Sequence, residues 1–563
     1  MNNIALAFSG GGFRAACFSL GTLAYLNHLR YEGKPLLEDV RYISSTSGGS
    51  ITNLVYSSYL FKGKSFAECY TFLKTEMDGE KLIARALKIL HQRKYWKARP
   101  EKSRNLINAF SLAYDELLQG TLFGIYDDRS NAPHLDEICV NSTEFTNGLP
   151  FRFQSSPPAG ISPGLVGNKF IFFRKSGIPQ SRQIKLADIL ASSSCFPSGF
   201  EPLIFPEDYT HQELSSEALR NAISFTANRY TLPTDDEEEE ADLHLADGDA
   251  LTDDYNSIDL LQDKQFNEKM HFGIMDGGVA DNQAIDAFKK ADKRRKESKF
   301  DLFIATDVTS YLMDGYTLPM EKRGLASRIS ILGILITLML ICSWLPVELL
   351  ALPRPWTPWM IITGTISGLL LLPFIVLVIR NIIGLFKKEK PKNSWGGIFN
   401  KYKWVFLRLR TGPVKQMILS RLKSVFILAN DIYLKQIRRM YYDALFDDPE
   451  YKNRTIQHAI YDLSKVKFPE SKTHTEELTP SAAMIEVAEK ARTMGTTLWF
   501  DKKQQTDKIK ESIIATGQFT LCYNLLKHLG KKTETDLTEK QKVLLQQLRQ
   551  DWDLFKKDPL RLL

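Results

Sequence analysis

The sequence predicts an α/β fold with a largely parallel central sheet, joined to a transmembrane helical hairpin and a mainly helical C-terminal region. Strand patterns and helical patterns alternate over residues 1 to about 60, which is typical of a parallel sheet with helices on its faces. Two long apolar segments lie in the middle of the chain, and helical spacing of apolar residues prevails after Pro391. The predicted units are residues 1–322, 323–386 and 387–563.

Length and composition narrow the class of protein. A chain of 563 residues is too long for one ordinary domain, and its 44% hydrophobic content suits a large core. The net charge of +7 is too small to indicate nucleic-acid binding, so we expect no nucleic-acid partner. The 6 cysteines are scattered without a C-x-x-C pair, which argues against disulfides and a zinc site and suits reduced thiols in the cytosol. The N-terminus lacks the pattern of a secretory signal peptide.

The first predicted strand, from Ile4 to Phe8, ends in a glycine-rich loop. Gly10, Gly11 and Gly12 follow it, and Arg14 precedes a helical pattern. Three glycines let the backbone approach a ligand closely and turn several N–H groups in one direction, so the loop can bind an oxyanion. The same stretch also fits the dinucleotide fingerprint G-x-G-x-x-A. That alternative lacks the acidic residue that should end the next strand.

A second strand-to-helix turn carries a serine. The apolar run from Val40 to Ile43 leads through Ser45 to Ser47, and a helical pattern follows Gly48 and Gly49. A sharp turn of this kind lifts the serine out of the sheet, beside the backbone N–H groups of the next helix. The turn demands small neighbours, and Ser45 stands where the G-x-S-x-G form has glycine. The alternative is a serine-rich turn that only caps the helix.

A third strand, from Phe272 to Met275, ends in Asp276, Gly277 and Gly278. A carboxylate at a strand end can act as the general base that a serine nucleophile needs. Asp247, which lies near an acidic block, is the competing carboxylate, but no comparable apolar strand precedes it. None of the 9 histidines lies in a motif that pairs it with the serine.

In this order, the glycine loop, the serine turn and the Asp-Gly-Gly segment resemble the motifs of patatin-like phospholipases. Three further stretches also resemble that family, namely 139–148, 186–197 and 300–307. The likeness therefore covers most of residues 1 to about 310. It implies a three-layer α/β/α hydrolase, and the chain is identified as a membrane-anchored bacterial member.

For the site, the resemblance implies a Ser–Asp dyad without a metal or cofactor. Asp276 would accept the proton of Ser47, and the N–H groups of Gly11 and Gly12 would bind the tetrahedral oxyanion. Gly10 belongs to the same oxyanion-binding loop. Arg14 either steadies this loop, attracts the phosphate of a substrate or forms an ion pair within the fold. The predicted supporting residues around the serine and the aspartate are Ser45, Gly48, Gly49, Gly277 and Gly278.

The two apolar segments, 329–345 and 359–379, predict membrane spans, since a span needs roughly 20 apolar residues. Lysines and arginines flank the outer ends of the pair, whereas the connecting turn carries only Arg354. By the positive-inside rule, we predict a two-span hairpin in a bacterial inner membrane, with the N- and C-terminal domains in the cytoplasm. The alternative is a buried helical pair in a soluble core.

Two other regions leave alternatives open. The helical stretch 62–127 is either a lid over the site or an ordinary helical insertion. In the C-terminal region, Met417 to Leu445 reads as a long helix and Thr497 to Phe500 as a short strand. This region either stands alone or returns to complete the sheet of the hydrolase domain.

Together these features predict a membrane-anchored serine acyl hydrolase that cleaves acyl esters of membrane glycerophospholipids into fatty acid and lysolipid. The alternatives are a small-molecule ester or thioester hydrolase of the same fold and a catalytically silent membrane scaffold. Besides the phospholipid substrate and the bilayer, we expect a regulatory protein or a homo-oligomer as partner, because unrestrained hydrolysis would damage the host membrane. The family resemblance allows a triggered membrane-degrading role, as in bacterial antiviral defence.

Overall fold

Strand β1, Ile4–Phe8, lies inside the central sheet, and all of its residues are buried. Successive side chains of a strand point to opposite faces of the sheet. Leu6 accordingly packs into one hydrophobic core, whereas Ala5 and Ala7 pack into a second core. A continuous apolar strand is expected where both faces of a parallel sheet are covered.

The structure is a computed structural model. It describes residues 3–225, 271–309, 325–351, 357–369, 405–469 and 478–563, apart from isolated positions within these ranges. Asp247, the competing carboxylate, lies outside the described residues.

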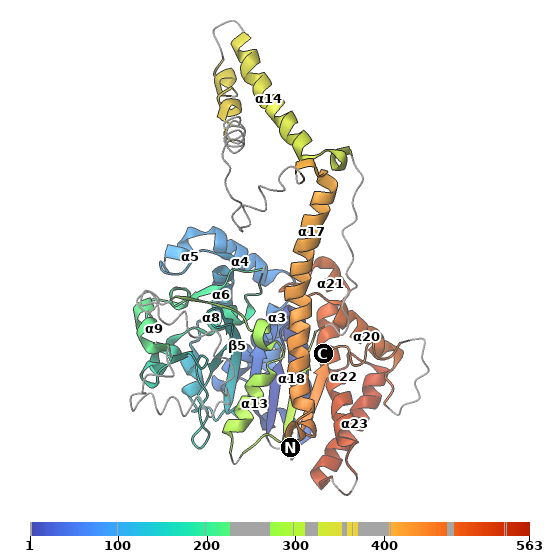
Figure 1. Cartoon of the computed structure of the whole chain (residues 1–563). Coiled ribbons are helices and arrows are strands. Elements are labelled where there is room, and N and C mark those ends of the chain that lie inside the picture. Colours follow the sequence, from blue (N-terminus) through green and yellow to red (C-terminus); the bar gives the residue numbers. More distant parts are fainter. Residues whose placement is uncertain are drawn as a thin grey trace. The chain divides into compact units, whose positions relative to one another are not determined.

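The central sheet has 8 strands, in the order β12-β11-β1-β4-β5-β10-β8, with β6 paired to β5. Figure 1 shows β5 of this sheet with α8, Leu186–Ser194, beside it. From β12 to β5, neighbouring strands run parallel, whereas β10 is antiparallel to both β5 and β8. The predicted α/β class with a mainly parallel central sheet is thereby confirmed. Besides β1, the strands of this sheet are β4 Val40–Thr46, β5 Glu137–Glu144, β6 Pro150–Gln154, β8 Leu203–Phe205, β10 Phe272–Asp276, β11 Leu302–Asp307 and β12 Thr455–Ala459.

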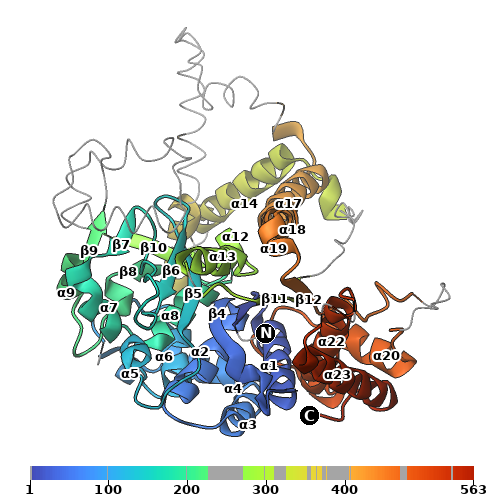
Figure 2. The same ribbon diagram turned by 90° about the horizontal axis from the view of Figure 1, so that it is seen from below.

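Helices cover both faces of this sheet. The larger core joins one face to α1, Gly12–His28, and α2, Gly48–Phe61, and the smaller core joins the other face to α13, Ile285–Arg294, and α18, Leu434–Phe446. Figure 2 shows α13 and α18 on the opposite side of the strands from α1 and α2. Further helices of the N-terminal part are α3 Phe66–Glu76, α4 Lys81–His91, α5 Arg93–Lys97, α6 Leu106–Leu117, α7 Ile178–Gln183, α8 Leu186–Ser194, α9 Ser216–Ala222 and α12 Gly278–Asp281.

The C-terminal region supplies the edge strand of the sheet, because β12 pairs in parallel with β11. Its helix α22, Ile509–Leu529, crosses α1 where two glycines meet. A Cβ on Gly21 would come within 2.1 Å of the Ile514 carbonyl oxygen, and one on Gly517 within 2.4 Å of the Phe18 carbonyl oxygen. The other helices here are α19 Pro449–Lys452, α20 Ala482–Thr493, α21 Lys502–Thr506 and α23 Glu539–Lys557.

Contacts within the chain define two compact units, which are Met1–Leu312 with Leu434–Leu563, and Met313–Tyr433. The boundaries at 322 and 386 stay a prediction. The second unit holds α14, Ile331–Ala351, and α17, Thr411–Ile427. The long helix predicted over 417–445 is confirmed, since α17, a π-helical turn and α18 follow one another without a break.

Within the part of the chain that the structure describes, no helix combines the length and apolar character needed to cross a membrane. The predicted transmembrane hairpin therefore finds no support in those residues. The second of the two predicted spans, 359–379, lies in good part outside them.

The stretch 62–127 is helical, as predicted, and part of it is tied into the fold. Lys102 and Asp188 form an ion pair of 2.7 Å in which both side chains are buried. This pair connects the segment before α6 to α8. The segment from Thr497 to Phe500 is irregular, so the strand predicted there is wrong. An apolar run of four residues does not distinguish a strand from a packed loop.

Candidate active site

Strand register brings the serine turn and the aspartate together. Thr46, the last residue of β4, pairs with Asn141 of β5, and Asp276, the last residue of β10, pairs with Ser142. Although β10 runs antiparallel to β5 and β4 runs parallel to it, the last residues of β4 and β10 pair with neighbouring residues of β5. Ser47 and Asp276 thus lie on the two sides of one strand.

Ser47 occupies the sharp turn between β4 and α2. Its backbone has φ 50° and ψ −121°, a conformation that costs a residue with a side chain about 1–3 kcal/mol. Hydrogen bonds hold it there, since the Ser47 N–H donates to the Ser193 hydroxyl at 2.9 Å and the Ser50 N–H donates to the Ser47 carbonyl at 2.9 Å. Strain of this kind keeps the serine hydroxyl out of the sheet and beside the start of α2.

The glycine loop lies directly against this turn. A Cβ on Gly48 would come within 2.1 Å of the Gly12 carbonyl oxygen, and a Cβ on Gly49 within 2.7 Å of Phe8. A Cβ on Gly10 would lie 3.2 Å from the Ser47 Cβ. Any side chain at these positions would push the loop away from the serine.

The N–H groups of the glycine loop differ in what they bind. The Gly10 N–H donates to the Asn282 carbonyl at 2.8 Å, so it serves the fold. Among the described residues, the N–H groups of Gly11 and Gly12 have no hydrogen-bond acceptor. Their φ angles of 140° and 58° suit glycine and give this stretch of backbone its turn. Two such amides beside a serine can stabilise a tetrahedral oxyanion.

Asp276 is a buried carboxylate with an unusual pKa. Only 3% of the residue is exposed, and burial raises its pKa to about 7. The hydrogen bond from the Gly278 N–H, at 2.7 Å, and the nearby Ser47 hydroxyl favour the charged form and limit this rise in the pKa. The Ser47 hydroxyl therefore lies near a carboxylate that can accept its proton near neutral pH.

Gly277 and Gly278 allow this geometry. A Cβ on Gly277 would come within 2.2 Å of the Asn141 carbonyl oxygen, and one on Gly278 within 2.9 Å of the Asp276 carboxylate. His271, the histidine nearest in sequence, lies at 2.9 Å from Glu207. Among the described residues, the candidate site thus contains a serine and an aspartate, and no histidine contacts either of them.

Ser45 belongs to a polar network beneath the turn. Its hydroxyl accepts hydrogen bonds from Asn53 at 2.8 Å and from Ser50 at 3.0 Å, and donates to the Cys139 carbonyl. Ser193 accepts from the Ser47 N–H and donates to the Asn141 carbonyl at 2.6 Å. A small hydroxyl in place of glycine thus stabilises the turn.

The Arg14 side chain donates hydrogen bonds to the C-terminal region. Its Nη1 donates to the carbonyls of Arg492, in the last turn of α20, and of Met494, just after that helix. Burial lowers its pKa to about 10, and attraction by Asp307 opposes this shift. Of its predicted roles, the contacts favour steadying the loop.

The family model for patatin-like phospholipases matches residues 6–289. The chain belongs to the patatin-like phospholipase family. This family of lipid acyl hydrolases was the one indicated by the motifs, and the resemblance is confirmed. Among proteins with curated descriptions, none matches the chain significantly.

Two solved structures of a human enzyme are similar to this patatin-like chain. One is the human GIVD cytosolic phospholipase A2, with 13% identity, 63% of this chain and 46% of that chain covered, and a TM-score of 0.31. The other is the same enzyme with methyl gamma-linolenyl fluorophosphonate inhibitor and terbium chloride, with 16% identity, coverage of 27% and 23%, and a TM-score of 0.19. This chain thus spans less than half the length of that enzyme, and TM-scores this low carry no argument.

Several residues of the patatin-like site were missed from the sequence. Ser193, Ser50 and Asn53 form the network under the turn, and of these only Ser193 lies in the stretch 186–197 that resembles the family. Thr497 supplies a carbonyl that accepts from the Phe13 N–H at 2.9 Å, just after the glycine loop. No local pattern predicts this contact, because its partners lie at opposite ends of the chain.

Proposed function

We propose that this patatin-like protein is a serine acyl hydrolase that cleaves acyl esters of membrane glycerophospholipids. The observation that carries the proposal is the Ser47 hydroxyl close to the buried Asp276 carboxylate, beside the Gly11 and Gly12 amides, which have no acceptor among the described residues. Each group has one role in the two-step reaction that follows.

In the acylation step, Asp276 accepts the hydroxyl proton while the Ser47 oxygen attacks the ester carbonyl carbon. The negative charge that develops on the carbonyl oxygen is stabilised by the N–H groups of Gly11 and Gly12, at about 3–4 kcal/mol per donor. The intermediate then collapses. Its C–O bond to the leaving alcohol breaks, Asp276 returns the proton to that oxygen, and lysolipid leaves an acyl-serine behind.

In the second step, Asp276 accepts a proton from water as the water oxygen attacks the acyl carbon. The bond to Ser47 breaks, its oxygen regains the proton, and fatty acid is released. A carboxylate with a pKa of about 7 suits both halves, because it gains and loses a proton readily at neutral pH.

A bilayer substrate agrees with the apolar surface of the second unit. On α14 the exposed side chains include Leu340 and Trp344, and on α17 they include Leu422 and Val425. Exposed apolar surface of this kind is typical of contact with lipid or protein. We propose that residues 323–386 hold the enzyme at the membrane as the predicted hairpin, with both chain ends in the cytoplasm.

The test is mass spectrometry of lipids after purified protein is incubated with vesicles of native membrane lipid. Wild type should release lysophospholipid and fatty acid. Ser47→Ala should release neither, whereas Ser216→Ala, a matched change at a serine of α9, should behave as wild type. Unchanged vesicles together with cleavage of a soluble ester or thioester would replace the proposal with a small-molecule hydrolase. No cleavage of any ester by a folded sample would indicate the silent scaffold.

A further inference from the structure

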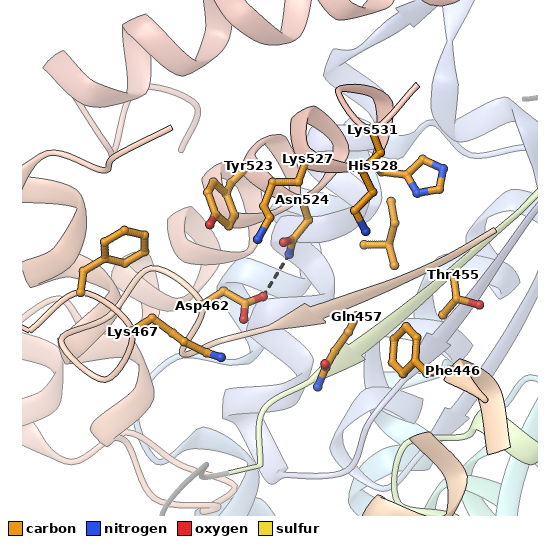
Figure 3. Close-up of a pocket in the computed structure, with 12 residues that line it drawn as sticks. Phe446, Thr455, Gln457, Asp462, Lys467, Tyr523, Asn524, Lys527, His528 and Lys531 are labelled. Atoms are coloured by element: carbon orange, nitrogen blue, oxygen red, sulfur yellow. Dashed lines mark hydrogen bonds between the residues drawn. The ribbon is translucent and has the colours of Figure 1, made fainter. Parts of the chain in front are cut away.

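A cavity of about 450 Å³ lies at the edge of the sheet, and none of its lining residues belongs to the site around Ser47. Strand β12 forms one wall, and the second half of α22 forms another. Figure 3 shows side chains of α22 facing those of β12, with a hydrogen bond from Asn524 to Asp462 between them. A volume of this size suits a small-molecule ligand.

The cavity is rich in cations. Lys467, Lys527 and Lys531 line it, and Asp462 is the one carboxylate among its lining residues. Within the described part of the chain, neither Lys527 nor Lys531 forms an ion pair with a carboxylate. The pKa of His528 reflects this positive potential. Burial lowers it to about 4, and the charges of Lys532 and Lys531 add to the shift.

Asp462 is committed to the fold. Its Oδ2 accepts from the Ala459 N–H at 3.0 Å and from the Asn524 amide at 3.1 Å, which fixes the turn after β12. Burial raises its pKa to about 6, while the charges of Lys467 and Lys527 lower it. Lys527 and Lys531, which pair with no carboxylate among the described residues, contribute two positive charges to the cavity at neutral pH.

We propose that this cavity binds a phosphate-bearing ligand. A phosphate group with a charge of about −2 would balance these two charges, and lysines are common phosphate binders. The amide group of Gln457 adds a polar donor, and Phe446 and Tyr523 add an apolar wall for the rest of the ligand. Binding at this cavity does not require hydrolysis at Ser47.

The source of the phosphate is either a soluble molecule or a lipid headgroup, and two titrations separate them. Both use the full chain with Ser47→Ala, so that no lipid is hydrolysed during the measurement. One arm is calorimetric titration with inorganic tripolyphosphate. The other is binding to vesicles of phosphatidylcholine with phosphatidylinositol bisphosphate, compared with phosphatidylcholine alone.

Removing two charged contacts by Lys527→Ala with Lys531→Ala should weaken binding about 100-fold, at about tenfold for each contact. The matched control is Lys502→Ala with Lys557→Ala, which removes two exposed lysines elsewhere and should leave the affinity unchanged. Asp462→Asn, which removes the opposing charge, should tighten binding. A variant that failed to fold could not bind more tightly, so this increase in affinity would also show that the cavity is intact.

Lysine-dependent binding of tripolyphosphate supports a soluble ligand, and lysine-dependent binding of the vesicles alone supports a headgroup. Absence of binding in both arms overturns the proposal. Equal weakening by the control pair also overturns it, because the effect would then be that of overall charge.

Discussion

The pKa of Asp276 leads to a quantitative prediction for the pH dependence of activity. The base must be ionised to accept the Ser47 proton, so kcat/KM should rise with pH as Asp276 loses its proton. With a pKa of about 7, roughly a tenth of the protein is ionised at pH 6 and roughly nine-tenths at pH 8. We therefore expect kcat/KM to rise about tenfold between these two values.

The same shift predicts an effect on stability. Because the folded protein holds this proton more tightly than the unfolded chain does, the contribution of Asp276 is fully present below the unfolded pKa of 3.8 and is lost as pH rises through about 7. The rise of about 3 pKa units corresponds to about 4 kcal/mol. Asp276→Asn keeps the shape without the charge, so it should abolish activity and yet raise the Tm, by more at pH 9 than at pH 5.

The assay is hydrolysis of a fluorogenic acyl ester from pH 5 to about 9, with thermal unfolding followed in the same buffers. Asp281 needs a control, because burial and the charge of Asp286 also raise its pKa to about 7. Asp281 accepts from the N–H groups of Ile285 and Asp286 at the start of α13, so Asp281→Asn should change stability and keep the rise in activity. A flat profile in wild type, or a lower Tm for Asp276→Asn at pH 9, would refute the reasoning.

Four further predictions follow from the fold. Ser47→Ala combined with Asp276→Ala should cost little more activity than either change alone, since the two act as a unit; additive losses in single-turnover assays would contradict this. Gly12→Ala places a Cβ within 2.5 Å of the carbonyl oxygens of the C-terminal loop and should reduce kcat by at least about 100-fold, whereas unchanged kcat would exclude that amide from the site. Gly517→Val should lower the Tm by separating α22 from α1, and an unaltered Tm would show that the crossing is not tight. In sealed cells, tags at both chain ends should resist protease while a tag in the 353–358 turn is cleaved; cleavage at either end refutes the hairpin.

Local sequence predicted the residues of the candidate site. The strands before Gly10, Ser47 and Asp276 are short apolar runs that end in small or polar residues, and each run forms a strand. Side-chain size and backbone preference act over a few residues, so they show in a short window. The order of the three motifs was enough to identify the family.

Tertiary structure alone decided how the site is completed. Pairing of β12 with β11 and the contact of the Thr497 carbonyl with Phe13 join segments far apart in the chain, and neither leaves a local pattern. For the same reason the Thr497 segment looks like a strand in sequence but packs as a loop. The sequence predicts that the Gly10 amide helps to bind an oxyanion, and only the folded chain shows that this N–H donates to the Asn282 carbonyl. Patterns of neighbouring residues record local preference, whereas these pairings depend on which surfaces the whole fold brings together.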